Sequence, residues 1–130
     1  TLGAFADHVA AVLPAGPTGL LVGGDEATSV RRVAVVGGAG DSALDAARQA
    51  GADVYLTADL RHHPASEHLE DGRPYLLCGT HWATEWVGLE PLGRRLVDDA
   101  HARGASLAVQ VSRIVTDPWA LRLPTGSDRA

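Results

Sequence analysis

The chain has 130 residues, of which 45% are hydrophobic and 21% are charged, and its net charge at pH 7 is −5. This composition is typical of a folded globular domain and excludes a disordered chain, and no apolar run is long enough to cross a bilayer. The acidic balance, the lack of a basic stripe and the single cysteine, Cys78, argue against nucleic-acid binding and favour a cytoplasmic location.

The first part of the chain predicts one helix and two strands. Residues 2–13 carry apolar side chains at helical spacing, and Pro14 ends this helix. Strands are expected at residues 19–22 and 31–36. The polar turn that separates the two strands predicts that they pair as an antiparallel hairpin.

The rest of the chain predicts a regular alternation of strands and helices, which implies parallel strands joined by crossover helices. The fully apolar runs VAVV, VYL and YLL are typical of strands covered on both faces. We therefore expect one α/β domain over residues 1–130, with a mixed, largely parallel sheet, helices on both faces and an irregular tail at 121–130. The expected elements are a glycine loop and helix within 37–51, a strand and polar loop within 52–64, a helix at 65–71, a strand at 74–79, a helix at 88–104 and a strand at 106–112.

Three polar motifs follow the predicted parallel strands directly. They are GGAGDS at 37–42, TADLRHHP at 57–64 and GTHWATEW at 79–86. Ligands of such sheets bind outside the carboxyl ends of the strands. We therefore expect all three motifs to lie on one rim of the sheet and to form any functional site there.

The glycine motif fits the G-x-G-x-x-A fingerprint loosely, through Gly38 and Gly40. Its backbone amides, together with Ser42, are candidates for binding an anion, and Asp59 lies at a suitable distance to hold a ribose. One alternative is therefore an NAD(P)-binding, Rossmann-like oxidoreductase domain. The other is a tight strand-to-helix turn that is capped by Ser42 and binds no ligand.

The second motif gathers Thr57, Asp59, His62 and His63 in one loop. Aspartate and histidine suit metal ligation or proton transfer. The alternative is that Pro64 starts the next helix and that the histidines are ordinary solvated loop residues.

The third motif places His81 and Glu85 four residues apart, so that both lie on one face if the segment is helical. A neutral imidazole and a carboxylate suit zinc, manganese or iron. The alternative is a first helical turn in which Glu85 interacts with the helix dipole and His81 has no ligand. Two ligands do not make a complete site, so the spacing alone leaves the metal role open.

Taken in order, GGAGDS, DVYLTADLRHH, GTHWATEW and a terminal TDPW resemble the C-terminal half of the Nif-three-like family, over roughly residues 19–120. Bacterial members are known as GTP cyclohydrolase 1 type 2 homologs. The departures are small: Ala58 and Thr80 replace glycines, and Trp82 replaces a tyrosine or phenylalanine. The positions that match the family pattern are Gly37, Gly38, Gly40, Ser42, Asp53, Thr57, Asp59, His63, His81, Thr84 and Glu85.

The resemblance implies a fold of two related α/β halves with a two-metal site between them. His81 and Glu85 match the histidine and glutamate that this half contributes as ligands. The N-terminal half, expected upstream of Thr1, contributes a His-His-Pro segment and an aspartate. The two divalent ions, whether zinc, manganese, iron or magnesium, would therefore be fully bound only with that half present. The His62-His63-Pro64 run of this chain belongs by position to the second half.

The resemblance also implies metal-assisted hydrolysis of a nucleotide or another small phosphorylated substrate. Asp59, His63 and Thr57 would orient the ligands or transfer protons, and the isolated chain would be inactive. A ring-like homo-oligomer, a hexamer in the full-length form, is expected as well. A non-catalytic scaffold or interaction module remains the third alternative.

Overall fold

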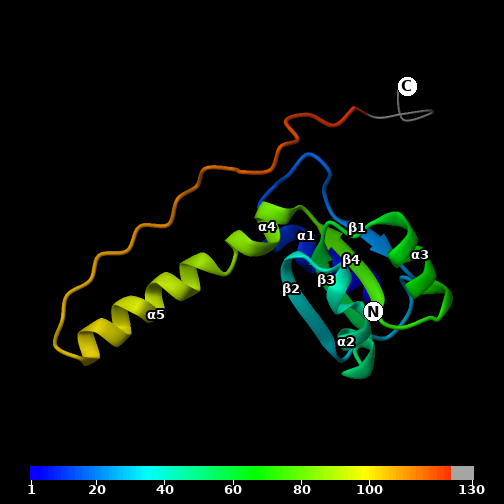
Figure 1. Ribbon diagram of the computed structural model, residues 1–130, viewed down its shortest axis with the longest axis horizontal. Coiled ribbons are helices and arrows are strands. Elements are labelled where there is room, and N and C mark those ends of the chain that lie inside the picture. Colours follow the sequence, from blue (N-terminus) through cyan, green and yellow to red (C-terminus); the bar gives the residue numbers. More distant parts are fainter. Residues whose placement is uncertain (124–130) are drawn as a thin grey trace.

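The structure, a computed structural model, describes residues 1–123 (Figure 1). A four-stranded sheet lies at its centre, with the strand order β1-β4-β3-β2. Neighbouring strands among β2, β3 and β4 pair in parallel, and the short β1 pairs antiparallel with β4. The strands are β1 Leu21–Gly23, β2 Val33–Ala39, β3 Val54–Ala58 and β4 Tyr75–Gly79.

Helices cover both faces of this sheet. On one face, α1 packs Leu2, Ala6 and Val9 against β3 and β4, and on the other face α2 and α3 pack against the same two strands. The mixed, largely parallel sheet with helices on both faces is therefore confirmed. The helices are α1 Leu2–Val12, the 3-10 turn η1 Asp41–Ala43, α2 Leu44–Gln49, α3 His62–Glu70, α4 His81–Trp86 and α5 Leu89–Ala102.

The register of the parallel strands aligns their carboxyl ends. Ala39 of β2 lies opposite Ala58 of β3, and Ala58 lies opposite Gly79 of β4. The residues that follow these three ends are the three polar motifs, so the motifs share one rim as expected. Alternate residues of β3 point to opposite faces, so Val54 packs with α1 whereas Tyr55 packs with α2.

The predicted hairpin between residues 19–22 and 31–36 is wrong. β1 and β2 lie at opposite edges of the sheet, and Leu21 of β1 pairs with Cys78 of β4 instead. The connecting segment is held by another partner, because the carbonyls of Glu26 and Thr28 accept hydrogen bonds from the first amides of α1. Those bonds hold the connection along the start of α1, so it does not fold back as a tight turn.

The predicted strand at 106–112 is also wrong. Residues 103–123 contain no helix or strand; α5 and residues 103–111 form an arm that projects from the body, and the chain then returns toward α4 (Figure 1). Within the described chain, residues 106–111 make no backbone hydrogen bond, because α5 carries them away from the sheet. Of the predicted tail at 121–130, residues 121–123 have no regular structure, and the remaining residues lie outside the described part.

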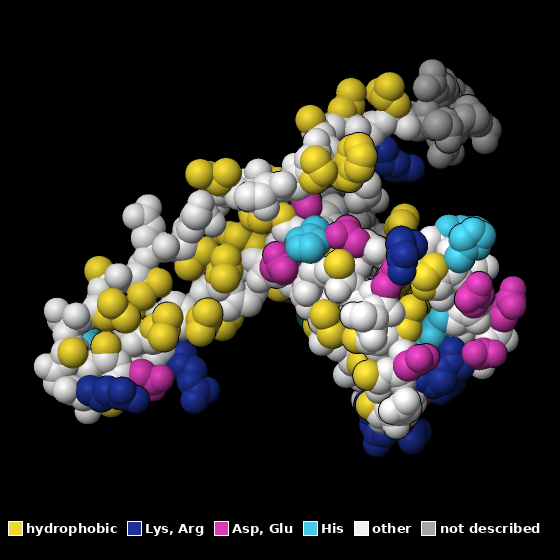
Figure 2. Space-filling view, in the orientation of Figure 1, with side chains coloured by type: hydrophobic (Ala, Val, Ile, Leu, Met, Phe, Trp, Pro, Cys, Tyr) yellow, Lys and Arg dark blue, Asp and Glu magenta, His cyan; other side chains and the backbone are white. Residues whose placement is uncertain are grey.

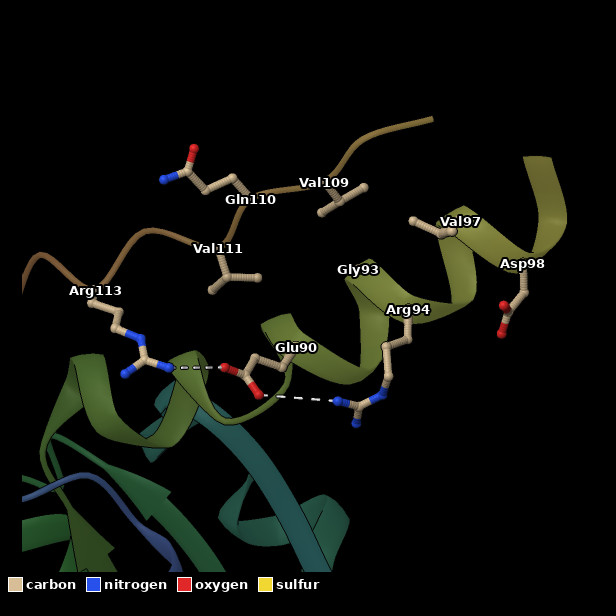
Figure 3. Close-up of a pocket in the computed structure, with 9 residues that line it drawn as sticks. All are labelled: Glu90, Gly93, Arg94, Val97, Asp98, Val109, Gln110, Val111 and Arg113. Atoms are coloured by element: carbon tan, nitrogen blue, oxygen red, sulfur yellow. Dashed lines mark ion pairs between the residues drawn. The ribbon is translucent and has the colours of Figure 1, made fainter. Parts of the chain in front are cut away.

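The arm is apolar along much of its length (Figure 2). Leu92 of α5 is 52% exposed, so the apolar face predicted for this helix is not buried within the described residues. A groove runs between α5 and the extended segment (Figure 3). Arg94 and Arg113 both pair with Glu90 there, so the charges lining this groove are largely compensated.

Asp53 connects the amino ends of three strands. Its Oδ2 accepts hydrogen bonds from the amides of Arg31 and Arg32, both at 2.9 Å, and its Oδ1 lies 2.5 Å from Nη1 of Arg73. The two amide hydrogen bonds lower the pKa of the Asp53 carboxyl most, and the charge of Arg73 lowers it further. The ionised carboxylate therefore stabilises the fold at neutral pH.

We predict that Asp53→Asn destabilises the chain at neutral pH and that the difference from the wild type shrinks in acid. Because the folded-state pKa is lowered, the stability from the ionised group is present above the unfolded-state pKa and is lost as pH falls through the folded value, below about pH 4. Urea unfolding between neutral pH and pH 3 measures this. Asp99→Asn, at an exposed position on α5, is the control and should show no such trend. An Asp53→Asn effect that stays constant down to pH 3 would contradict the assignment.

Candidate functional site

The centre of the rim is a pair of side chains on α4. This helix starts after Thr80, whose Oγ1 accepts a hydrogen bond from the amide of Ala83 at 3.4 Å. The spacing of four residues places His81 and Glu85 on one face, with 3.3 Å between His81 Nε2 and Glu85 Oε1. Their side chains are 44% and 54% exposed, so the pair faces an open space at the edge of the sheet.

Asp59, at the carboxyl end of β3, holds the other side of the histidine ring. Its Oδ2 lies 2.6 Å from His81 Nδ1. Asp59 has a φ of 53°, in the left-handed region that residues other than glycine seldom adopt. Aspartate tolerates this conformation better than most residues, and such backbone strain clusters at functional sites.

The two carboxylates determine the protonation chemistry of His81. Its pKa is raised, first by the hydrogen bond that the ring donates to Asp59, while partial burial lowers it and the charge of Glu85 raises it again. Because a carboxylate only accepts hydrogen bonds, Nδ1 carries a proton in this arrangement. By the same argument Nε2, beside Glu85, carries a proton in the charged ring. Loss of that proton leaves the tautomer with its lone pair on Nε2, which a metal ion or an acid–base reaction needs.

The glycine loop lies directly against this pair. Gly38 has a φ of 74°, its amide donates to Thr84 Oγ1 at 3.0 Å, and its carbonyl accepts from Thr57 Oγ1 at 2.9 Å. A Cβ added at Gly38 would lie 2.7 Å from Glu85 Oε1 and 3.0 Å from His81 Nε2. The missing side chain at Gly38 therefore leaves the space that the pair occupies.

Close packing also accounts for Gly40. Its carbonyl accepts a hydrogen bond from the Tyr55 hydroxyl at 3.0 Å, its amide donates to the Ala58 carbonyl at 3.2 Å, and an added Cβ would lie 2.0 Å from Thr57 Oγ1. The amides of Gly38 and Gly40 thus both donate hydrogen bonds within the protein. The loop has a structural explanation that requires no bound phosphate.

The remaining candidates surround the pair at different depths. Thr57 is fully buried and its hydroxyl holds the glycine loop. His63 lies in the first turn of α3, exposed, with its ring edge-on to His62 at 5.2 Å between centroids. Ser42 lies in η1 and is exposed, and its side chain makes no hydrogen bond to another described residue. Of the predicted residues, the structure therefore brings Asp59, His81 and Glu85 into direct contact.

The pair offers two ligand atoms on its own. Across residues 1–123, no three His, Cys, Asp or Glu side chains are grouped so that they could hold a metal ion together. Asp59 is occupied with Nδ1 of His81, which leaves Nε2 of His81 and Oε1 of Glu85 as donors. Protein metal sites usually have three or four such donors, so these two donors alone do not complete a metal site.

The pattern of the sequence did not reveal that residues 112–117 return to α4. The indole Nε1 of Trp86 donates to the Ser112 carbonyl at 2.7 Å, and the amide of Trp82 donates to Asp117 Oδ1 at 3.0 Å. The TDPW motif was the available signal in the sequence, because an aspartate and a tryptophan so close together after a long helix suggest a segment that packs against the rest of the domain. Residues 116 and 117 of this segment, the start of the TDPW motif, thus lie at one side of the site.

A family model described as Duf34/NIF3 (NGG1p interacting factor 3) matches residues 1–118. The chain is 47% identical over 131 residues to a GTP cyclohydrolase 1 type 2 homolog of Streptomyces coelicolor, which covers 98% of this chain and 46% of that protein. It is 45% identical over 128 residues to the protein of the same name from Mycobacterium tuberculosis, with 97% and 32% covered. The chain therefore spans less than half of these curated relatives.

Solved structures agree with the match. A Bacillus cereus protein related to NIF3 superimposes with a TM-score of 0.77 at 31% identity, over 94% of this chain and 33% of that chain. A Staphylococcus aureus protein superimposes with a TM-score of 0.77 at 30% identity, over 92% and 33%. The α/β unit described above thus corresponds to one part of these larger folds.

We predict that Gly38→Ala destabilises the chain more than Gly104→Ala does. Both glycines have a positive φ, of 74° and 73°, so each alanine has the same backbone strain, about 1–2 kcal/mol. At Gly104 no atom lies within 4 Å of an added Cβ, whereas at Gly38 the ends of the Glu85 and His81 side chains would have to move aside and lose their contacts. Urea unfolding compares the two variants. Equal losses of unfolding free energy would show that the glycine loop does not press on the pair.

Proposed function

The chain belongs to the Duf34/NIF3 family, and we propose that it is the α/β half of a two-metal hydrolase that acts on a nucleotide or another small phosphorylated substrate. The observation that carries this proposal is the pair on α4, where His81 Nε2 and Glu85 Oε1 lie 3.3 Å apart at the carboxyl rim of the sheet. The name of the curated relatives, GTP cyclohydrolase 1 type 2 homolog, supports a nucleotide substrate.

The donor set fits a divalent metal ion. An imidazole nitrogen and a carboxylate oxygen suit zinc, manganese and iron, and a carboxylate also suits magnesium. His81 and Glu85 would hold the ion. When bound, two such ions polarise the substrate and lower the pKa of a water molecule to near neutrality.

Asp59 acts through His81 in this proposal. A histidine that ligates a metal usually donates its other ring N–H to a carboxylate, which fixes the tautomer and raises the basicity of the ligating nitrogen. The bond between Asp59 Oδ2 and His81 Nδ1 has this arrangement. Thr57 contributes by holding the Gly38 carbonyl, and we propose His63, exposed on the same rim, as a group that transfers protons.

The other ligands belong to the rest of the protein in this proposal. The curated relatives are two to three times as long as the part that this chain covers. A His-His-Pro segment and an aspartate of the N-terminal half would face the rim and complete the two-metal site. We propose the same half as the partner of this chain, within a cytoplasmic homo-oligomer that is a hexamer in the full-length form.

The described residues do not favour the alternatives. A dinucleotide would need the amides of the glycine loop to bind its phosphates. The amides of Gly38 and Gly40 already donate hydrogen bonds to Thr84 and Ala58. A scaffold role gives no reason for two carboxylates to be held against the ring of His81. Within residues 1–123, no helix is both long and apolar enough to span a membrane.

We predict that the 130-residue chain binds Zn²⁺ weakly and that His81→Ala or Glu85→Gln removes this binding. Asp59→Asn should weaken it by about 10–100-fold, because losing the partner of a ligating histidine has that effect. Calorimetric titration with Zn²⁺ measures the three variants against His101→Ala, a histidine on α5 that serves as the control. Chelator-resistant zinc that persists in His81→Ala would place the site elsewhere.

The full-length protein tests the hydrolase itself. Metal-dependent release of product from a nucleotide should fall by several orders of magnitude in His81→Ala and Glu85→Gln, because each removes a ligand of the ions that activate water. Turnover that survives both changes would contradict the proposal. An inactive wild type that still binds metal at the pair would favour the scaffold alternative.

A further inference from the structure

A cavity of about 460 Å³ lies beside the histidine of the pair. Leu21 of β1 and Cys78 of β4 line it, as do Asp59 and His81 from the rim. The remaining side is the segment 116–119, the TDPW motif. This is the size of a small-molecule site, and it combines apolar walls with a few polar groups, as such sites do.

We propose that this cavity binds an uncharged planar ring that carries an N–H donor, stacked on Trp119 and hydrogen-bonded to Asp117. Amino-substituted nucleobases are the common rings of this kind. The inference rests on the proposed function in one respect: the phosphate end of the substrate would bind to the metal ions and not to this cavity. The ring site is built entirely from residues of this chain, so it can be tested alone.

The charges of the lining exclude a phosphate from the cavity itself. Two carboxylates, Asp59 and Asp117, line it, and no arginine of the described chain does; the sequence contains no lysine. His81 also lines the cavity, but its ring is paired with Asp59 and Glu85, so an anion there would still meet an excess of negative charge. A neutral group that donates hydrogen bonds is attracted by the same carboxylates.

Asp117 carries an acceptor that has no donor. Its Oδ1 accepts the hydrogen bond from the Trp82 amide, whereas Oδ2 is buried and finds no hydrogen-bond partner anywhere in residues 1–123. A buried carboxylate oxygen without a donor is costly, and buried polar groups are usually paired. Asp117 also lines the cavity, so a ring bound there could supply the missing hydrogen from an N–H once it displaces the atoms that cover Oδ2.

Trp119 supplies the flat surface. Trp119 lines the cavity and is 66% exposed, so its indole has accessible surface against which a ring could stack. The segment that carries it is fixed at two points, by the hydrogen bonds of Trp86 to Ser112 and of Trp82 to Asp117. Stacking on an indole tolerates any base, so Trp119 would give affinity and Asp117 would give selectivity for a donor.

The position of the cavity links the ring to the pair. Asp59 and His81 line the cavity and also form the contact that orients His81 Nε2 toward Glu85. A ring bound against Trp119 therefore lies next to the place proposed for the metal ions. The arrangement holds a substrate by two separate ends, the ring by this chain alone and the phosphate by the ions.

The test is a calorimetric titration of the 130-residue chain, without metal, with adenosine, guanosine, cytidine and purine riboside. The first three nucleosides carry an exocyclic amino group and purine riboside does not. We expect at least one of the three to bind, and adenosine to bind about tenfold more tightly than purine riboside, because a hydrogen bond to a carboxylate has about that effect. No saturable binding of any nucleoside, or equal binding of adenosine and purine riboside, would overturn the proposal.

Variants separate the two contacts. Asp117→Asn keeps an acceptor for the Trp82 amide but replaces Oδ2 by a donor, so it should abolish the preference for adenosine over purine riboside. Trp119→Ala should weaken every nucleoside by about tenfold or more, and Trp119→Phe should restore most of the loss because it retains a stacking face. Leu121→Ala, exposed on the same segment, is the control and should bind normally.

The outcome is distinguishable from failure of the metal proposal. Zn²⁺ binding should be unchanged in Trp119→Ala, since Trp119 is not a ligand of the ion. Unchanged nucleoside binding in both Asp117→Asn and Trp119→Ala would overturn the ring site and leave the metal pair intact. Loss of zinc binding in Glu85→Gln, a residue that does not line the cavity, with normal adenosine binding would support both proposals independently.

Discussion

The missing side chain at Gly38 is the constraint on which the whole site depends. β2 ends directly against α4, and there is room for the His81–Glu85 pair because no Cβ fills the space between them. The hydrogen bond from the Gly38 amide to Thr84 then fixes the helix to the sheet. Since α4 has only six residues, it is too short to be stable without such contacts. The geometry of the pair is therefore a property of the sheet as much as of the helix.

The alternation of apolar runs and helical segments was enough to predict the sheet, because each parallel strand is a continuous apolar run that local sequence reveals. It was also enough to predict the shared rim, since parallel strands must end on one side. The partner of β1 was not predictable in this way, because pairing with Cys78 joins residues far apart in the sequence. The segment 106–112 has the composition of a strand, but it follows α5 away from the sheet and stays unpaired within the described residues.

The candidate site shows the same division. His81 and Glu85 could be paired from their spacing alone, because a helix fixes which residues share a face. The contact of Asp59 with His81 spans 22 residues and requires a left-handed backbone at an aspartate, which no local pattern predicts. The glycine fingerprint was ambiguous because glycines that approach a ligand and glycines that approach a neighbouring strand look alike in sequence. The bonds to Tyr55 and Thr57 favour the second explanation.

Because the chain returns to α4, the length of the arm can change without moving the residues on either side of it. The arm begins at Gly88, just after α4, and comes back to the same helix at Ser112 and Asp117, so residues 88–111 are a loop whose two ends are fixed. The entropy of closing such a loop grows only with the logarithm of its length, and doubling a flexible segment costs about 0.6 kcal/mol. Insertions in the extended part of the arm would therefore leave the position of Trp119 almost unaffected. The reach of the arm can therefore change during evolution without changing the residues that line the cavity.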